Sequence, residues 1–190
     1  VQGAMGDGDW LVIDGGNTHF WSEIAVNIAG FQGKKLGGIL HPGTFSLLGV
    51  GVSFAVSAKN VDPNRNVVLI SGDGAFLSGG LSIEAAFQEN RPIVVVIDNN
   101  GGLDCISQQQ ERLFASGTHY ATDFRDIPFH AMFEGLGGHG ELVTRREDII
   151  PAVRRAMASG KTACVNVKVK GVISPIVLAT TSKRDKASIE

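Results

Sequence analysis

An aspartate stands between two glycines in the segment 71–76, directly after a run of apolar residues. Gly72 and Gly74 permit a sharp turn, and successive backbone N–H groups in such a turn can bind an anion. Asp73 by itself would repel a phosphate, so its presence there predicts an intervening cation. Mg²⁺ and Ca²⁺ prefer carboxylate, amide and carbonyl oxygens, together with phosphate oxygens and water. The segment therefore predicts a phosphate site that is bridged by a metal.

Further oxygen ligands follow the next apolar run, in the sequence Asp-Asn-Asn-Gly-Gly at 98–102. Asn100 comes 27 positions after Asp73. If both segments end neighbouring parallel strands, their side chains converge on one edge of the sheet. We then expect a carboxylate oxygen from Asp73, an amide oxygen from Asn100 and the backbone carbonyl oxygen of Gly102 to coordinate the metal.

The elements that must position these groups alternate along the chain. Runs rich in β-branched residues at 10–14, 67–71, 93–97 and 163–169 predict strands that are buried on both faces, as in a parallel sheet. Between them, helical patterns cover about 47–60, 81–90, 127–136 and 145–158. Thr144 and Glu147 have capping-box spacing for the last helix, and Pro151 predicts a kink or a start nearer the proline. The pattern predicts a doubly wound α/β domain, with a mainly parallel sheet and helices on both faces.

Composition narrows the class of protein. The chain has 190 residues, of which 43% are hydrophobic and 19% charged, and its net charge of −2 argues against a nucleic-acid partner. No apolar run is long enough to span a membrane, and residues 1–10 lack the features of a signal peptide. Cys105 and Cys164 lie far apart without metal-ligand spacing, so a reduced, cytoplasmic setting is expected. We expect one domain over 1–172 and a tail over 173–190, whose charged residues 182–190 are expected either to be mobile or to fold over a site as a lid.

Gly-Asp-Gly followed about 27 residues later by Asn-Asn resembles the cofactor-binding motif of thiamine diphosphate (ThDP)-dependent enzymes such as acetolactate synthase and pyruvate decarboxylase. The resemblance covers nearly the whole chain and identifies it with their diphosphate-binding (PP) domain. It implies ThDP and Mg²⁺ as cofactors, with Gly72, Asp73, Gly74, Ala75 and Phe76 at the cofactor. The alternative is an unrelated turn and asparagine pair at two strand ends.

Two other segments match cofactor-contacting stretches of this family. In the turn at 14–18, Asn17 and Thr18 occupy the positions that contact the terminal phosphate, although they could instead form a plain helix cap. In the stretch 41–51, Leu48 is the candidate for the apolar side chain that bends the cofactor into a V. The Ser46 carbonyl would accept the aminopyrimidine N–H. Leu48 could equally be a core residue.

Asp104 lies four residues after Asn100, in the loop that the resemblance places over the thiazolium ring. The related oxalyl-CoA decarboxylases have an aromatic residue in this loop. A carboxylate beside a reacting hydroxyl can act as a base if burial raises its pKa. Asp104 is therefore a candidate catalytic residue beside Leu48, and the alternative is a solvated loop carboxylate.

The resemblance also indicates what the chain lacks. In this family a glutamate of a separate pyrimidine-binding (Pyr) domain contacts the aminopyrimidine ring, and nothing here resembles that domain. We therefore expect a fragment or one subunit of a split enzyme, inactive alone. A Pyr domain, on a missing part of the chain or on another subunit, would complete it in a homo- or hetero-oligomer.

The segments 136–144 and 158–167 resemble benzaldehyde lyase, oxalyl-CoA decarboxylase and 2-hydroxyacyl-CoA lyase. The preferred interpretation is 2-hydroxyacyl-CoA lyase, acting on an acyl-CoA, and acetolactate synthase, acting on 2-oxo acids, is the rival. Two other classes stay open. A dinucleotide-binding oxidoreductase domain is one, but no Gly-x-Gly-x-x-Gly follows the first strand with an acid roughly 20 residues later. A regulatory homologue without activity is the other, although it would have no need of Asp73 and Asn100.

Overall fold

The apolar runs form a parallel sheet, as their composition predicts. The computed structural model describes residues 1–114, 116–175 and 178–179. The strands are β1 (Trp10–Ile13), β2 (Gly38–Leu40), β3 (Val67–Gly72), β4 (Val94–Asn99), β5 (His139–Val143) and β6 (Ala163–Lys168). They lie in the order β2-β1-β3-β4-β6-β5, and every neighbouring pair is parallel. The two strands not predicted from the sequence, β2 and β5, are the sheet edges, where partly exposed residues dilute the hydrophobic signal.

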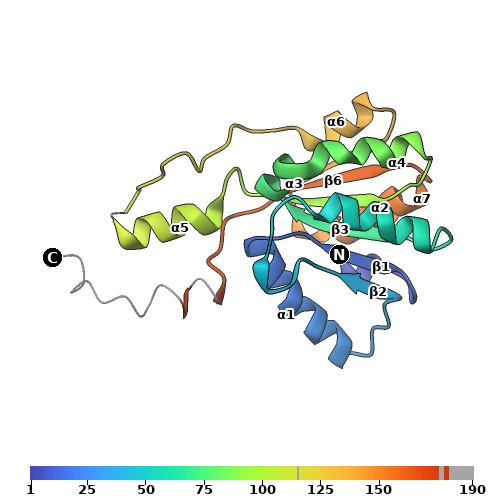
Figure 1. The fold of residues 1–190 in the computed structure, drawn as a ribbon, viewed down its shortest axis with the longest axis horizontal. Helices are drawn as coiled ribbons and strands as arrows, with labels where there is room; N and C mark the ends of the chain where they lie inside the picture. The colour runs from blue at the N-terminus through green and yellow to red at the C-terminus, as the bar shows by residue number, and fades with distance from the viewer. Residues whose placement is uncertain (115, 176–177, 180–190) are drawn as a thin grey trace.

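Helices cover both faces of the sheet (Figure 1). The α-helices are α1 (Asn17–Phe31), α2 (Gly51–Val61), α3 (Asp73–Gly79), α4 (Glu84–Gln88), α5 (Asp104–Leu113), α6 (Phe129–Gly135) and α7 (Ile149–Ala158). Alternate residues of one strand face opposite sides of the sheet and pack into different hydrophobic cores. In β3, Leu69 packs with Val52 of α2 and Phe133 of α6, whereas Val68 packs with Val153 of α7. The doubly wound α/β fold is therefore confirmed.

Two helix starts differ from prediction because the local backbone turns first. The helix expected from about residue 47 begins at Gly51, because Ser46 (φ 47°) and Gly49 (φ 87°) both have left-handed backbone conformations. The prediction that Thr144 and Glu147 form a capping box is wrong. A 3₁₀ turn at Arg146–Asp148 precedes α7 and has no side-chain cap hydrogen bond.

The last helix begins near the proline, one of the two outcomes expected. Helix α7 starts at Ile149, so Pro151 lies in its first turn, where a missing N–H costs nothing. The helix expected over 81–90 is a 3₁₀ turn, Gly80–Ile83, followed by the short α4. The predicted tail from 173 is described only at 173–175 and 178–179, and the mobility expected for 182–190 concerns residues outside the described ones.

Chain topology brings the predicted site together. The chain passes from β1 to the edge strand β2 and returns past β1 to β3, so the crevice between β1 and β3 is a topological switch point. Ligands of open α/β sheets bind outside the carboxyl ends of strands at such a point. Over the described part of the chain, we find no helix with the length and apolar character that crossing a membrane requires.

Candidate functional site

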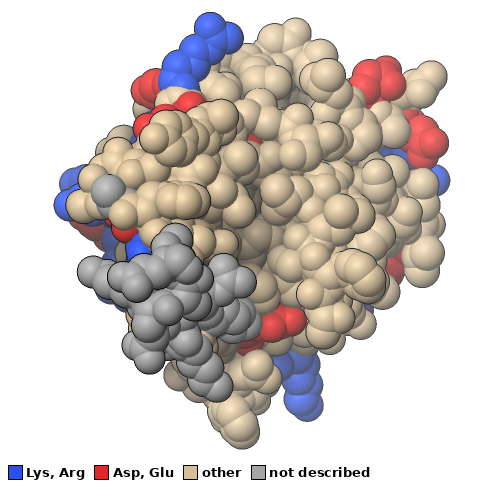
Figure 2. Space-filling view, turned by 60° about the vertical axis from the view of Figure 1, so that its left-hand side comes forward, with Lys and Arg blue, Asp and Glu red and all other residues tan. Residues whose placement is uncertain are grey.

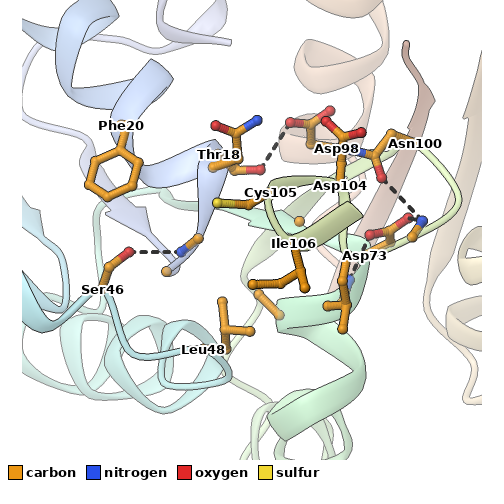
Figure 3. Close-up of a pocket in the computed structure, with 18 residues that line it drawn as sticks. Thr18, Phe20, Ser46, Leu48, Asp73, Asp98, Asn100, Asp104, Cys105 and Ile106 are labelled. Carbon is orange, nitrogen blue, oxygen red and sulfur yellow. Dashed lines mark hydrogen bonds between the residues drawn. The ribbon is translucent and has the colours of Figure 1, made fainter. Parts of the chain in front are cut away.

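A cavity of about 280 Å³ opens at the carboxyl ends of β1, β3 and β4 (Figure 3). Its walls come from the turn after β1, the start of α3, the loop after β4 and the first turn of α5. All but one of the site residues predicted from the sequence line it, namely Asn17, Thr18, Ser46, Leu48, Gly72, Asp73, Gly74, Ala75, Asn100, Gly102 and Asp104. Segments far apart in the sequence therefore meet at one place.

Backbone N–H groups hold the Asp73 carboxylate firmly. Its Oδ1 accepts the N–H of Gly74 at 2.7 Å, and its Oδ2 accepts those of Gly101 at 2.7 Å and Gly102 at 3.1 Å. The Asn100 amide oxygen accepts the same Gly102 N–H at 3.2 Å. The structure thus brings together the three residues predicted to hold a metal. Gly102 is required sterically, because a Cβ there would lie 2.5 Å from the Thr122 carbonyl oxygen.

Three carboxyl groups, those of Asp73, Asp98 and Asp104, line the same cavity. Burial raises the pKa of each above the usual value for aspartic acid. The negative charge of Asp73 further raises the pKa values of Asp98 and Asp104. Among the described residues, no lysine or arginine lines the cavity. The site therefore favours a cation and would repel a bare phosphate.

The turn after β1 leaves a polar atom without a partner at the cavity. The Asn17 amide N–H₂ donates to the Val172 carbonyl at 2.9 Å, whereas its buried Oδ1 has no hydrogen-bond partner. Thr18 Oγ1 donates to Asp98 Oδ2 at 3.0 Å. Helix α1 has Gly16 as its N-cap, with no side-chain cap bond, so the plain-cap alternative for Asn17 and Thr18 is wrong.

Ser46 and Leu48 reach the cavity from the segment before α2. Ser46 Oγ accepts the Gly16 N–H at 2.8 Å, which ties this segment to the turn after β1. The approach is close, because a Cβ on Gly15 would lie 2.2 Å from the Ser46 carbonyl oxygen. Leu48 lines the cavity with 36% of its surface exposed, so the alternative of a core leucine is not supported.

Asp104 differs from expectation in its local structure. It is the first residue of α5 and not part of a loop. Gln108, one turn later, donates its Nε2–H to Asp104 Oδ2 at 2.6 Å. The carboxyl group also packs against Gly171, where a Cβ would lie 2.2 Å from Asp104 Oδ1. Asp104 is therefore a partly buried helix-start carboxyl, which corrects both the predicted loop and the alternative of a solvated loop carboxylate.

Phe76 is the predicted site residue that does not line the cavity. Its ring is 3% exposed and meets Phe129 edge-on, with the ring centroids 5.7 Å apart. Helix α3 begins at Asp73, and its first turn already rotates this position toward the sheet. The side chain of Phe76 belongs to the hydrophobic core and does not line the site.

Two acids, the buried Asp14 and the half-buried Asp98, organise the site and were missed from the sequence. Asp14 Oδ1 accepts the N–H groups of Gly15 at 2.8 Å and Gly49 at 3.0 Å, and its Oδ2 accepts the Ser71 hydroxyl at 3.0 Å. Asp98 Oδ2 accepts a hydrogen bond from the Thr18 hydroxyl, as described above. Both acids stand where an apolar strand ends, and that position was the signal available in the sequence.

Comparison with protein families decides the class of this domain. Residues 14–167 match the family described as thiamine pyrophosphate enzyme, C-terminal TPP binding domain. The chain belongs to this family. The domain is therefore an α/β domain of the kind that binds thiamine diphosphate, and the dinucleotide-binding alternative is set aside.

Relatives include enzymes of two activities. A probable acetolactate synthase of Mycobacterium bovis is 39% identical over 129 residues, which cover 67% of this chain and 23% of that protein. The 2-hydroxyacyl-CoA lyase 2 of Bos taurus is 31% identical over 158 residues, covering 82% of this chain and 24% of that protein. The chain spans about a quarter of the length of these curated relatives.

A solved structure shares the fold. The thiamine diphosphate-dependent 4-hydroxybenzoylformate decarboxylase of Rhodococcus jostii RHA1 matches with a TM-score of 0.72 and 25% identity. The match covers 90% of this chain and 31% of the decarboxylase chain. The names of these relatives therefore include a synthase, a lyase and a decarboxylase.

Proposed function

We propose that this chain holds the diphosphate of ThDP through Mg²⁺ bound by Asp73, Asn100 and the carbonyl of Gly102. The observation that carries the proposal is the cavity of three carboxyl groups with no basic side chain among its described lining residues. A doubly charged metal ion neutralises these acids and the diphosphate together. The donors are the carboxylate, amide and carbonyl oxygens that Mg²⁺ prefers.

The remaining polar groups suit the other side of the diphosphate. Asn17 and Thr18 begin α1, and the N-terminus of a helix favours a phosphate. We assign contacts with the terminal phosphate to Asn17 and Thr18, although the free Oδ1 of Asn17 accepts hydrogen bonds and must face a donor or the metal. Leu48 would support the bent cofactor, and the Ser46 carbonyl would accept its amino group. Bound ThDP supplies an electron sink next to a carbonyl carbon.

A second surface is needed to enclose the cofactor. The cavity, at about 280 Å³, is slightly smaller than the usual ligand pocket of about 300–1,000 Å³. Large apolar side chains next to the lining residues Ser46 and Leu48 are exposed to solvent, by 94% for Phe45 and 60% for Leu47. The molecular surface on this side carries few charged side chains (Figure 2). We propose that a Pyr domain, from the same polypeptide or another subunit, covers this face in a cytoplasmic oligomer and supplies the glutamate.

For the reaction, we propose cleavage of a 2-hydroxyacyl-CoA, as performed by a 2-hydroxyacyl-CoA lyase. Support comes from Asp104, whose raised pKa suits a base for the 2-hydroxyl proton. Acetolactate synthase is the second candidate, favoured by the 39% identity to the mycobacterial protein. An oxalyl-CoA decarboxylase type of reaction is less well supported, because it requires no base for a hydroxyl proton.

Calorimetry of the complete enzyme tests the metal-bridged site. We expect ThDP to bind in the presence of Mg²⁺ and to lose most of its affinity when a chelator removes the metal. Equal affinity with and without a divalent metal would contradict the proposal. Assays with a 2-hydroxyacyl-CoA and with pyruvate then separate the lyase from the synthase, because only the lyase releases formyl-CoA.

A further inference from the structure

A second cluster of metal-binding side chains lies outside the cofactor cavity. His19 and Glu23 stand one helical turn apart on the same face of α1, and His41 follows the edge strand β2. His19 Nε2 lies 3.0 Å from Glu23 Oε1 and 3.1 Å from His41 Nδ1. The third side of the triangle, from His41 Nδ1 to Glu23 Oε1, measures 3.6 Å. Three potential ligand atoms therefore face one another.

The dimensions of this triangle match one face of a metal coordination sphere. Zinc binds imidazole nitrogen and carboxylate oxygen at about 2.0–2.2 Å, so two ligands at a tetrahedral angle are about 3.3–3.6 Å apart. Two of the observed separations, 3.0 and 3.1 Å, lie slightly below this range, and the third, 3.6 Å, lies at its upper end. A small contraction is expected where no ion separates the ligands.

Hydrogen bonds within the cluster cannot satisfy all three of these atoms. His41 Nδ1 faces the Gly43 N–H at 3.3 Å, which places a lone pair on that nitrogen. The Glu23 carboxylate is also an acceptor, so a single proton on His19 Nε2 faces two acceptors and can bond well to only one of them. A divalent cation in the centre would satisfy all three atoms.

Contacts behind the cluster orient the buried ligand. His19 is 2% exposed, and its ring stacks on Phe20 with the centroids 5.4 Å apart. Its other nitrogen, Nδ1, lies 3.2 Å from Ser46 Oγ. Histidine ligands of metals usually bond through their second ring nitrogen to such a partner, which fixes the ring. Glu23 and His41 are about 40% exposed, so the remaining coordination positions face solvent.

We propose that His19, Glu23 and His41 bind a divalent transition metal of the Zn²⁺ type, at a site separate from the cofactor metal. Two imidazoles and one carboxylate favour Zn²⁺, Co²⁺ or Ni²⁺ over Mg²⁺, which prefers oxygen ligands in octahedral geometry. The metal would join α1 to the segment 41–46. Because Ser46 Oγ also accepts the Gly16 N–H, the bound metal would fix the turn that begins α1.

The test is metal binding to the purified protein whose cofactor site is first saturated with ThDP and Mg²⁺. We expect calorimetry to give one Zn²⁺ per chain, and Co²⁺ to give the visible absorption of a four- or five-coordinate ion. His41→Ala and Glu23→Gln each remove one exposed ligand, and each should weaken Zn²⁺ binding at least about 100-fold. This estimate exceeds the 10–100-fold cost of losing a group behind a ligand.

His119→Ala is the matched control, because His119 also contacts two acids, but through opposite ring nitrogens that cannot share one ion. This variant should bind Zn²⁺ as the wild type does. His41→Cys should retain the site and add a sulfur-to-cobalt charge-transfer band, a signature that a misfolded chain would not produce. Equal Zn²⁺ affinity of wild type, His41→Ala and Glu23→Gln, or no Co²⁺ spectrum in the wild type, would overturn the proposal. Neither result would bear on the Mg²⁺–ThDP site.

Discussion

Two regions of the cofactor site are built in different ways. The strand-end cradle, formed by Asp14, Asp73 and residues 98–102, sits on the carboxyl ends of the sheet. The α5 arm, residues 104–114 and 116–123, extends away from the body of the domain (Figure 1). In the cradle, Asp14 and Asp73 are buried and each accepts at least two backbone N–H groups. In the arm, Phe114 and Tyr120 are exposed by 72% and 73%.

Because the two regions are built differently, we expect the cradle to determine cofactor binding and the arm to determine reaction specificity. Buried backbone hydrogen bonds hold the cradle whether or not a partner is present, so the chain itself shapes the end of the site proposed to hold the diphosphate. The arm has few buried contacts, so a partner surface can change its position at little cost. Because Asp104 begins the arm, we expect substitutions there to change the reaction more than cofactor affinity.

The largest effect is expected from Asp73→Ala, in the cradle. The variant removes the proposed metal ligand and leaves the N–H groups of Gly74 and Gly101 without their acceptor. Because loss of a group behind a ligand already costs 10–100-fold, we expect ThDP affinity to fall at least about 100-fold. Calorimetry in Mg²⁺ measures this, with Asp7→Ala as a surface control. Unchanged ThDP affinity in Asp73→Ala would show that the cradle does not determine cofactor binding.

The next effect is on stability and concerns Asp14→Ala. Asp14 accepts three hydrogen bonds that join β1, β3 and the Gly49 turn. Leaving buried donors unpaired costs about 1–3 kcal/mol, so the free energy of unfolding should fall by that amount. Denaturant titration measures it. Asp126→Ala, which replaces an exposed carboxylate, should change stability by less than about 0.5 kcal/mol. Equal losses in both variants would show that Asp14 does not organise the cradle.

Asp104→Asn tests the arm. If Asp104 removes the 2-hydroxyl proton, kcat for cleavage of a 2-hydroxyacyl-CoA should fall at least about tenfold, the lower part of what a positioned base contributes. ThDP affinity should stay within about twofold, because the cradle is untouched. Steady-state kinetics and calorimetry of the complete enzyme measure the two quantities. A wild-type cleavage rate would leave the lyase proposal without its residue-level support.

The smallest effect is the pH response of the arm. Hydrogen bonds that His119 donates to the carboxylates of Glu111 and Asp123 raise its pKa above the usual value of about 6.5. Because the folded-state pKa is raised, this contact stabilises the arm fully below about pH 6.5 and is lost as the pH rises through the folded value. An NMR titration should show the raised pKa, and Glu111→Gln should lower it. A His119 pKa at or below 6.5 in the wild type would contradict the prediction.

Local patterns in the sequence were sufficient for the fold class and for bringing Asp73 and Asn100 together, whereas the rest of the predicted cavity lining came from the family resemblance. Apolar runs predicted four parallel strands because burial on both faces requires continuous β-branched residues. Gly-Asp-Gly and Asn-Asn could be assigned to one edge because parallel strands end on the same side. Strand-end position thus assigned Asp73 and Asn100 to one site, and the family resemblance added Asp104, which lines the same cavity.

Only the tertiary structure decided how side chains pair across the fold. Phe76 faces Phe129, 53 positions later, and no local pattern shows that its first helical turn points into the core. Asp98 meets Thr18, and His19 meets His41, through the packing of α1 against the sheet and the segment after β2. Periodicity reports which face of an element is apolar, but not which residue of another element covers it. The contacts that orient both proposed metal sites therefore depend on the packed fold.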